Sequence, residues 1–206
     1  MSVLKNKRGL SKLEFYNNAR KLRKELTACL LRNFGVKLKI SKTGNLATSE
    51  IINENDEETI LGEFPEWALA EFRRTIMLIL RNLMMNITAG NSIFPSAMND
   101  PKDPNGSPLP AEYIRRVQSD ELADRRRYQT AAIANCQQLI QELQYFTDVF
   151  SLQFDTFKIS VEKIIPFIEM IHFEIRLLKG WRKSTNDLAK KIKKGDLKGR
   201  VVESEE

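Results

Sequence analysis

The stretch that decides the fold is residues 119–150, which read SDELADRRRYQTAAIANCQQLIQELQYFTDVF. Apolar and small residues recur in it at intervals of three and four, from Leu122 to Phe146. This is the spacing of one face of an α-helix. Ser119 or Asp120 can provide the N-cap, because a short polar side chain there accepts a hydrogen bond from a free backbone N–H. We therefore predict a long amphipathic helix over residues 119–150.

The same periodicity predicts three further helices. The first covers residues 11–34 and opens with SKLE at residues 11–14, which has the form of a capping box. The second covers residues 64–89. The last covers residues 155–182. Pro166 lies inside its pattern, so it either kinks this helix or marks its true first turn.

Two long connections separate the first three helices. Residues 36–62 contain turn-forming residues and an acidic stretch, with room for a short helix or turn around residues 54–61. Repeated prolines forbid regular structure through most of residues 91–118. We interpret that segment as an exposed insertion, in which residues 111–118 can form a helical turn.

The end of the chain differs in character from the helices. Residues 184–206 are polar and charged, which is typical of a flexible tail. No strand pattern is recognised between the helices. We therefore predict an all-α protein: a four-helix bundle over residues 1–183 with long connections, followed by a basic C-terminal tail.

Positive charge is concentrated at the two ends of this basic chain. The whole sequence has 33 Lys and Arg against 27 Asp and Glu, a net charge of +6. Residues 1–39 hold eleven basic residues against two acidic ones, and residues 177–206 hold nine against five. Residues 40–80 are acidic instead, with three against eight. Such clusters are the electrostatic footprint of a polyanion-binding protein, although a solvated helix face has the same composition.

The residue content argues against catalysis and cofactor binding. His172 is the only histidine, and with Glu169 it forms one Glu-x-x-His, whereas a di-metal bundle needs this motif on two helices. Cys29 and Cys136 lie in helical patterns and are expected to be buried without a disulfide. No glycine-rich phosphate loop is present. We expect no enzyme activity, no catalytic residue, no metal site and no cofactor.

The hydropathy pattern also bears on location. No apolar run approaches the roughly 20 residues that a membrane span requires. The basic N-terminus lacks the apolar core of a secretory signal. We expect a cytoplasmic protein that does not enter a membrane.

Two basic runs allow a structural or a binding interpretation. Arg125–Arg127 spread over about 200° of a helix, so they cannot share one direction. They can pair with neighbouring acids such as Asp124, or they can clamp phosphate through their guanidinium forks. Trp181 is followed by Arg182 and Lys183. The tryptophan suits a core or interface anchor, and the cations suit either a negative partner or the negative end of the helix dipole.

Several of these runs together resemble a known family. It is the four-helix-bundle family that includes the accessory variability determinant of diversity-generating retroelements, and proteins encoded in ribosomal-RNA intervening sequences are related to it. The matching runs are KRGLSKLEF at 7–15, LLRNFGV at 30–36, RRRYQTAAI at 125–133 and LLKGWRK at 177–183. The similarity covers residues 7–35, 64–90 and 119–183.

The resemblance implies a non-catalytic homo-oligomer, a pentameric barrel of bundles with a positive surface. Such a protein would bind a reverse transcriptase and RNA or an RNA/DNA hybrid, and it would support mutagenic retrohoming. The family binds through basic side chains rather than a fixed motif, and this chain differs from its shorter members in the connections and the tail. The nucleic-acid-binding candidates are Arg20, Arg23, Lys24, Arg73, Arg74, Arg81, Arg125, Arg126, Arg127, Arg182 and Lys183.

Two other classes of function remain open from the residues. One is a helical protein-interaction module whose basic surfaces meet an acidic partner without nucleic acid. The other is a small enzyme or metal carrier of the bundle class.

Overall fold

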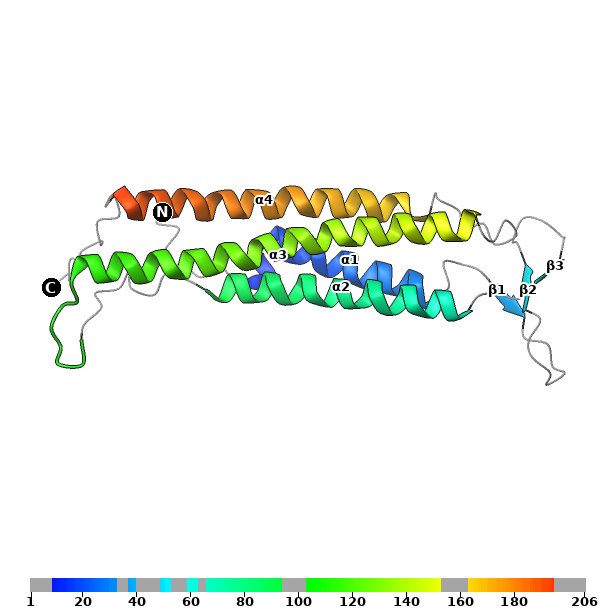
Figure 1. Cartoon of the computed structure of the whole chain (residues 1–206), viewed down its shortest axis with the longest axis horizontal. Helices are drawn as coiled ribbons and strands as arrows, with labels where there is room; N and C mark the ends of the chain where they lie inside the picture. The colour runs from blue at the N-terminus through cyan, green and yellow to red at the C-terminus, as the bar shows by residue number, and fades with distance from the viewer. Residues whose placement is uncertain are drawn as a thin grey trace.

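The chain folds into a bundle of four helices that run alternately up and down (Figure 1). The computed structural model describes residues 9–32, 37–39, 49–52, 59–62, 66–93, 103–152 and 163–194. The helices are α1 (Glu14–Leu31), α2 (Glu66–Ser92), α3 (Ala111–Leu152) and α4 (Ile165–Lys194). The predicted all-α four-helix bundle is confirmed.

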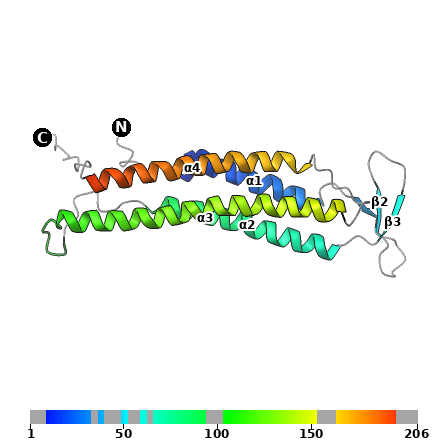
Figure 2. The same ribbon diagram turned by 45° about the horizontal axis from the view of Figure 1, so that its top comes forward.

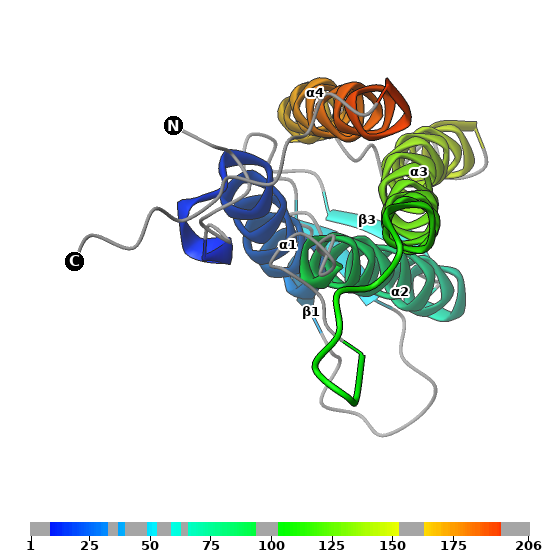
Figure 3. The ribbon, with the colours of Figure 1, turned by 90° about the vertical axis from the view of Figure 1, so that its left-hand side faces the viewer.

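Each helix packs against two others, in the ring order α1, α2, α3, α4 and back to α1. The view along the bundle shows the four helices at the corners of a square (Figure 3). Most of their buried apolar side chains form one continuous core. The deciding stretch in α3 contributes Ala132, Cys136, Leu139, Leu143 and Phe146. Full burial of a leucine or phenylalanine side chain stabilises the fold by roughly 1.5–3 kcal/mol, so this face fixes the position of α3.

Trp181 of α4 contacts residues from all three other helices. Its indole stacks on the ring of Phe15 from α1, with centroids 4.5 Å apart and planes inclined by 17°. Gly90 of α2 lies against the same indole, because a Cβ atom added there would be 2.9 Å from Trp181 Cη2. From α3, Cζ of Arg125 lies 5.5 Å from the ring centroid, in a cation–π arrangement. We call this set of four residues the tryptophan junction.

A hydrogen bond also connects each neighbouring pair of helices. Arg73 Nε donates to the Leu30 carbonyl (3.1 Å), Asn86 Nδ2 to Asn135 Oδ1 (2.8 Å), Gln129 Nε2 to Thr185 Oγ1 (2.8 Å), and Asn18 Nδ2 to Glu174 Oε2 (2.8 Å). Losing the partner of a buried polar group costs about 1–3 kcal/mol. Apolar contacts are non-directional. These bonds therefore favour one register of the helices over its alternatives.

The start of α1 differs from the predicted capping box. Leu10–Lys12 form a 3-10 turn, η1, and α1 begins after Leu13 with no side-chain cap. Ser11 lies inside the turn, whose backbone hydrogen bonds involve the residues on both sides of it. Its hydroxyl is therefore not at the N-cap. Its carbonyl oxygen instead accepts a hydrogen bond from Asn17 Nδ2 at 2.9 Å.

The first connection contains strands that the sequence did not predict. They are β1 (Lys37–Lys39), β2 (Ser49–Ile52) and β3 (Thr59–Gly62), and they form an antiparallel sheet in that order. Strands of three or four residues are too short for an alternating pattern to stand out. The short helix or turn suggested around residues 54–61 is wrong at residues 59–61, which belong to β3, and its remainder lies outside the described residues. The sheet lies beyond one end of the bundle (Figure 1).

The predicted boundary of α3 is also wrong. The helix begins at Ala111, so residues 111–118 belong to it and not to an insertion. Ser119 and Asp120 are exposed residues within the helix instead of caps. The physical reason is Pro110, which ends the proline-rich segment and whose carbonyl accepts the first helical hydrogen bond from Ile114 N at 3.1 Å.

The last helix begins later and ends later than predicted. α4 starts at Ile165, which confirms that Pro166 lies in the first turn. It continues to Lys194, so the predicted tail is helical over residues 184–194. Thr185 and Ile192 are buried there and continue the core spacing. The rest of the predicted tail, and the predicted helical residues 155–162, lie outside the described residues.

As a result, α3 and α4 continue as a pair beyond α1 and α2 (Figure 2). We call residues 111–127 of α3 and 182–194 of α4 the α3–α4 extension. None of the described helices contains an apolar segment that would span a bilayer.

The tryptophan junction predicts opposite effects of alanine at two glycines. Gly90→Ala should lower the free energy of unfolding by roughly 1–3 kcal/mol, because the new Cβ overlaps the Trp181 indole. Gly180→Ala is the matched control: its Cβ meets nothing within 4 Å, so the better helix propensity of alanine should stabilise by about 0.5–1 kcal/mol. Urea unfolding measures both. If alanine changed the free energy of unfolding equally at both positions, the close packing of Gly90 against Trp181 would be contradicted.

Candidate nucleic-acid interface

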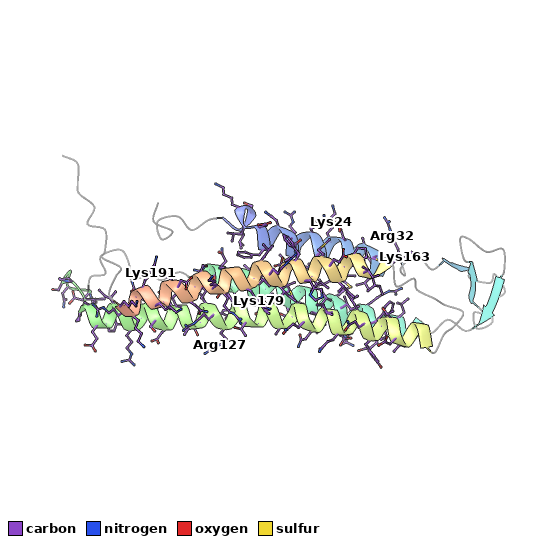
Figure 4. All side chains as sticks on the ribbon, turned by 90° about the horizontal axis from the view of Figure 1, so that it is seen from above. Lys24, Arg32, Arg127, Lys163, Lys179 and Lys191 are labelled. Atoms are coloured by element: carbon purple, nitrogen blue, oxygen red, sulfur yellow. The ribbon has the colours of Figure 1, made fainter. Side chains whose placement is uncertain are left out.

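The predicted basic residues of α1 lie on its outer face. Arg20, Arg23 and Lys24 are exposed, and none of them forms an ion pair with another described residue. Figure 4 shows Lys24 on this helix. Lys21 differs, because its Nζ lies 3.9 Å from Glu25 Oε1. The three predicted residues thus offer positive charge to solvent.

The predicted residues of α2 divide between surface and packing. Arg74 and Arg81 are exposed. Arg73 is half-buried, and its Nε donates a hydrogen bond to the Leu30 carbonyl at the end of α1. A cation at a helix C-terminus complements the negative end of the helix dipole. Arg73 therefore connects two helices, which distinguishes it from its neighbour Arg74.

The three consecutive arginines have three different environments. Arg125 is half-buried over the Trp181 indole, and burial lowers the pKa of its guanidinium. Arg127 is exposed and pairs with Asp124 over 3.4 Å. Arg126 is half-buried and lines a cavity on the α3–α4 extension. The ion-pair interpretation therefore holds for Arg127, and phosphate binding by this run stays a prediction.

The two predicted residues of α4 lie beside the junction. Arg182 is half-buried, and its Nη1 donates to Thr130 Oγ1 on α3 at 3.4 Å. Lys183 is exposed. Both belong to the α3–α4 extension, whose segments together hold eleven Lys and Arg against five Asp and Glu.

A cavity of about 810 Å³ runs between the two helices of this extension. We call it the basic groove. Its charged lining comprises Glu112, Arg115, Arg116 and Arg126 from α3, and Lys190 and Lys193 from α4. Five cations thus surround one carboxylate, and none of the five forms an ion pair with another described residue.

Four of these cations were missed from the sequence. Arg115 and Arg116 fall in the segment interpreted as an insertion, and Lys190 and Lys193 fall in the segment interpreted as a tail. The helical spacing of core positions nevertheless extends into both segments. In α3 it continues toward the N-terminus through Leu122, Gln118 and Ile114. In α4 it continues toward the C-terminus through Trp181, Thr185 and Ile192.

Buried titratable groups lie elsewhere in the bundle. Glu174 has no exposed surface, its Oε2 accepts from Asn18, and its Oε1 has no partner. Burial raises the pKa of this carboxyl to about 8. Cys29 and Cys136 are free thiols, half-buried and buried respectively, and burial raises the pKa of both. Thiols of raised pKa are weak nucleophiles at neutral pH.

The described part of the chain brings together no group of three His, Cys, Asp or Glu side chains that could hold a metal ion. His172 and Glu169 are both exposed on α4. Their pairing in sequence therefore does not place them in the bundle core, where the ligands of a di-metal bundle lie.

A second surface of interest is the outer face of α2. Met77, Leu78 and Met85 are 43%, 53% and 57% exposed there. Arg74 and Arg81 lie at neighbouring positions of the same face. Exposed apolar side chains grouped on one helix face are typical of protein contact surfaces.

Comparisons with protein families, with curated proteins and with solved structures find no match to this chain. The resemblance to the retroelement accessory family therefore depends on the sequence runs alone.

The buried Glu174 carboxyl should make the stability of the fold depend on pH. The native state retains a proton that the unfolded chain releases, so stability should fall as pH rises from about 4.5 to about 8. Glu174→Gln is neutral at every pH and keeps the shape of the side chain. The free energy of unfolding of the variant, relative to that of the native sequence, should therefore increase by on the order of a few kcal/mol from pH 5 to pH 9. Urea unfolding at both pH values measures this, and a difference that does not change with pH would contradict a buried protonated carboxyl.

Proposed function

We propose that this chain is a non-catalytic accessory protein that binds nucleic acid through the phosphate backbone. The observation that carries the proposal is the excess of cations on the α3–α4 extension, eleven against five acids. The exposed cations of α1 add a second positive surface. Positive charge distributed over several helices suits a long polyanion better than a small acidic ligand.

The proposal extends to the partner through the resemblance to the retroelement accessory family. In this view the chain forms a homo-oligomer, such as a pentamer, and binds a reverse transcriptase together with RNA or an RNA/DNA hybrid. The reverse transcriptase performs the polymerisation, and this chain supports retrohoming by binding. A reverse transcriptase gene with template and variable repeats is expected beside the gene for this chain. A neighbourhood without one would contradict this partner.

Phosphate binding predicts a steep dependence on salt. The logarithm of the association constant should fall linearly with the logarithm of salt concentration, by about 0.7 per contacted phosphate for single strands and about 0.9 for duplex. Filter binding of RNA and of RNA/DNA hybrid from low to high salt measures the slope. A protein that contacts four or more phosphates should show a slope of about −3 or steeper. No binding at low salt, or a flat dependence, would contradict nucleic-acid binding.

A second candidate function is a helical protein-interaction module for an acidic partner. The observation that favours it is the exposed Met77, Leu78 and Met85 on α2, next to Arg74 and Arg81. Such a face suits an amphipathic segment with acidic flanks. The same salt series separates the two candidates, because an interaction module would show no affinity for nucleic acid at low salt.

A further inference from the structure

The basic groove identifies which part of a nucleic acid the extension would hold. We propose that this groove binds the backbone of a single strand, through its phosphates and not its bases. The inference rests on the proposed function and specifies the site and the form of the ligand.

The groove has the length and charge for several consecutive phosphates. Arg115 and Arg116 lie in one turn of α3, and Arg126 lies about 16 Å further along the helix at 1.5 Å per residue. Lys190 and Lys193 are one turn apart on the antiparallel α4, so both walls carry positive charge. A strand advances about 3.4 Å per phosphate along a duplex and more when extended, so the groove matches roughly three to five phosphates.

These cations are available to a ligand. Arg115, Arg116, Lys190 and Lys193 are exposed, and among described residues none of them has an ion-pair partner. Arg126 is half-buried, so fewer of its rotamers are accessible. Guanidinium groups bind phosphate oxygens through two parallel hydrogen bonds, and ammonium groups act as point charges.

The lining of the groove favours phosphate over base recognition. No Phe, Tyr or Trp belongs to it, and its uncharged members include Ala189 and Ile192. Proteins that read or hold single-stranded bases stack them on aromatic side chains. Without that platform, the affinity should be insensitive to base identity.

The shape of the groove favours one strand over two. Its cations lie on two packed helices, along the furrow that the pair forms at its surface. A duplex is stiff, with a persistence length of about 50 nm, and holds its phosphates on a rigid cylinder. A single strand bends freely, so its consecutive phosphates can follow the furrow and contact cations of both helices.

The test uses the full chain, fluorescent oligouridine RNA, and a duplex of the same length. Arg116→Gln with Lys190→Gln removes two charges from the groove. Arg32→Gln with Lys179→Gln removes two exposed charges outside the groove (Figure 4) and is the matched control. The groove variant should bind oligouridine about tenfold more weakly, with a salt slope shallower by about 1.4. The control should lose less than threefold, and affinity for the duplex should change equally little in both variants.

The possible results distinguish a failure of the groove proposal from a failure of the proposed function. If the native chain binds neither RNA at low salt, the proposed function fails together with the groove. If the native chain binds but the two variants lose the same affinity, only the groove proposal is overturned. If the groove variant loses as much affinity for duplex as for single strand, strand selectivity is overturned. Far-UV circular dichroism checks folding, and Arg115→Gln with Lys193→Gln serves as a second variant with the same expected result.

Discussion

The packing of Trp181 against Gly90 is the constraint on which the rest of the structure depends. A tryptophan buries about 150–250 Å² of surface, and here the indole leaves no room for a side chain at Gly90. Gly90 allows α2 to approach within ordinary contact of the indole, while Phe15 stacks on it from α1. The indole thus sets the separation of α4 from two helices at once. Arg125 holds α3 to the same point by a cation–π contact.

The tryptophan junction also marks the boundary between two parts of the molecule that differ in how much apolar surface they bury. On one side, four helices enclose an apolar core, and arginines such as Arg73 serve packing. On the other side, α3 and α4 continue as a pair, joined by the buried contact between Gln129 and Thr185. A pair of helices has less surface to bury, so more of its side chains face solvent. Charge that would be costly in the enclosed part is therefore concentrated on the extension.

The sequence predicted the parts of the fold that depend on local spacing. Three-and-four periodicity located the middle of every helix, and Pro166 was correctly considered as a first-turn residue. The helix ends were missed where a short polar side chain such as Ser119 suggested a cap inside a continuing helix. The role of Arg125 could not be foreseen, because it depends on which residue of α4 lies opposite. The same holds for the groove, whose cations become neighbours only when two distant segments pair.

The central claim is that α3 and α4 form a paired extension in the free chain and that nucleic acid binds there. Amide hydrogen exchange, with and without single-stranded RNA, tests it most directly. The account predicts that residues 182–194 are already protected in the free chain, and that RNA adds protection in residues 111–127 and 182–194. Exchange at unfolded-chain rates over residues 182–194, or RNA-dependent protection confined to α1, would contradict it.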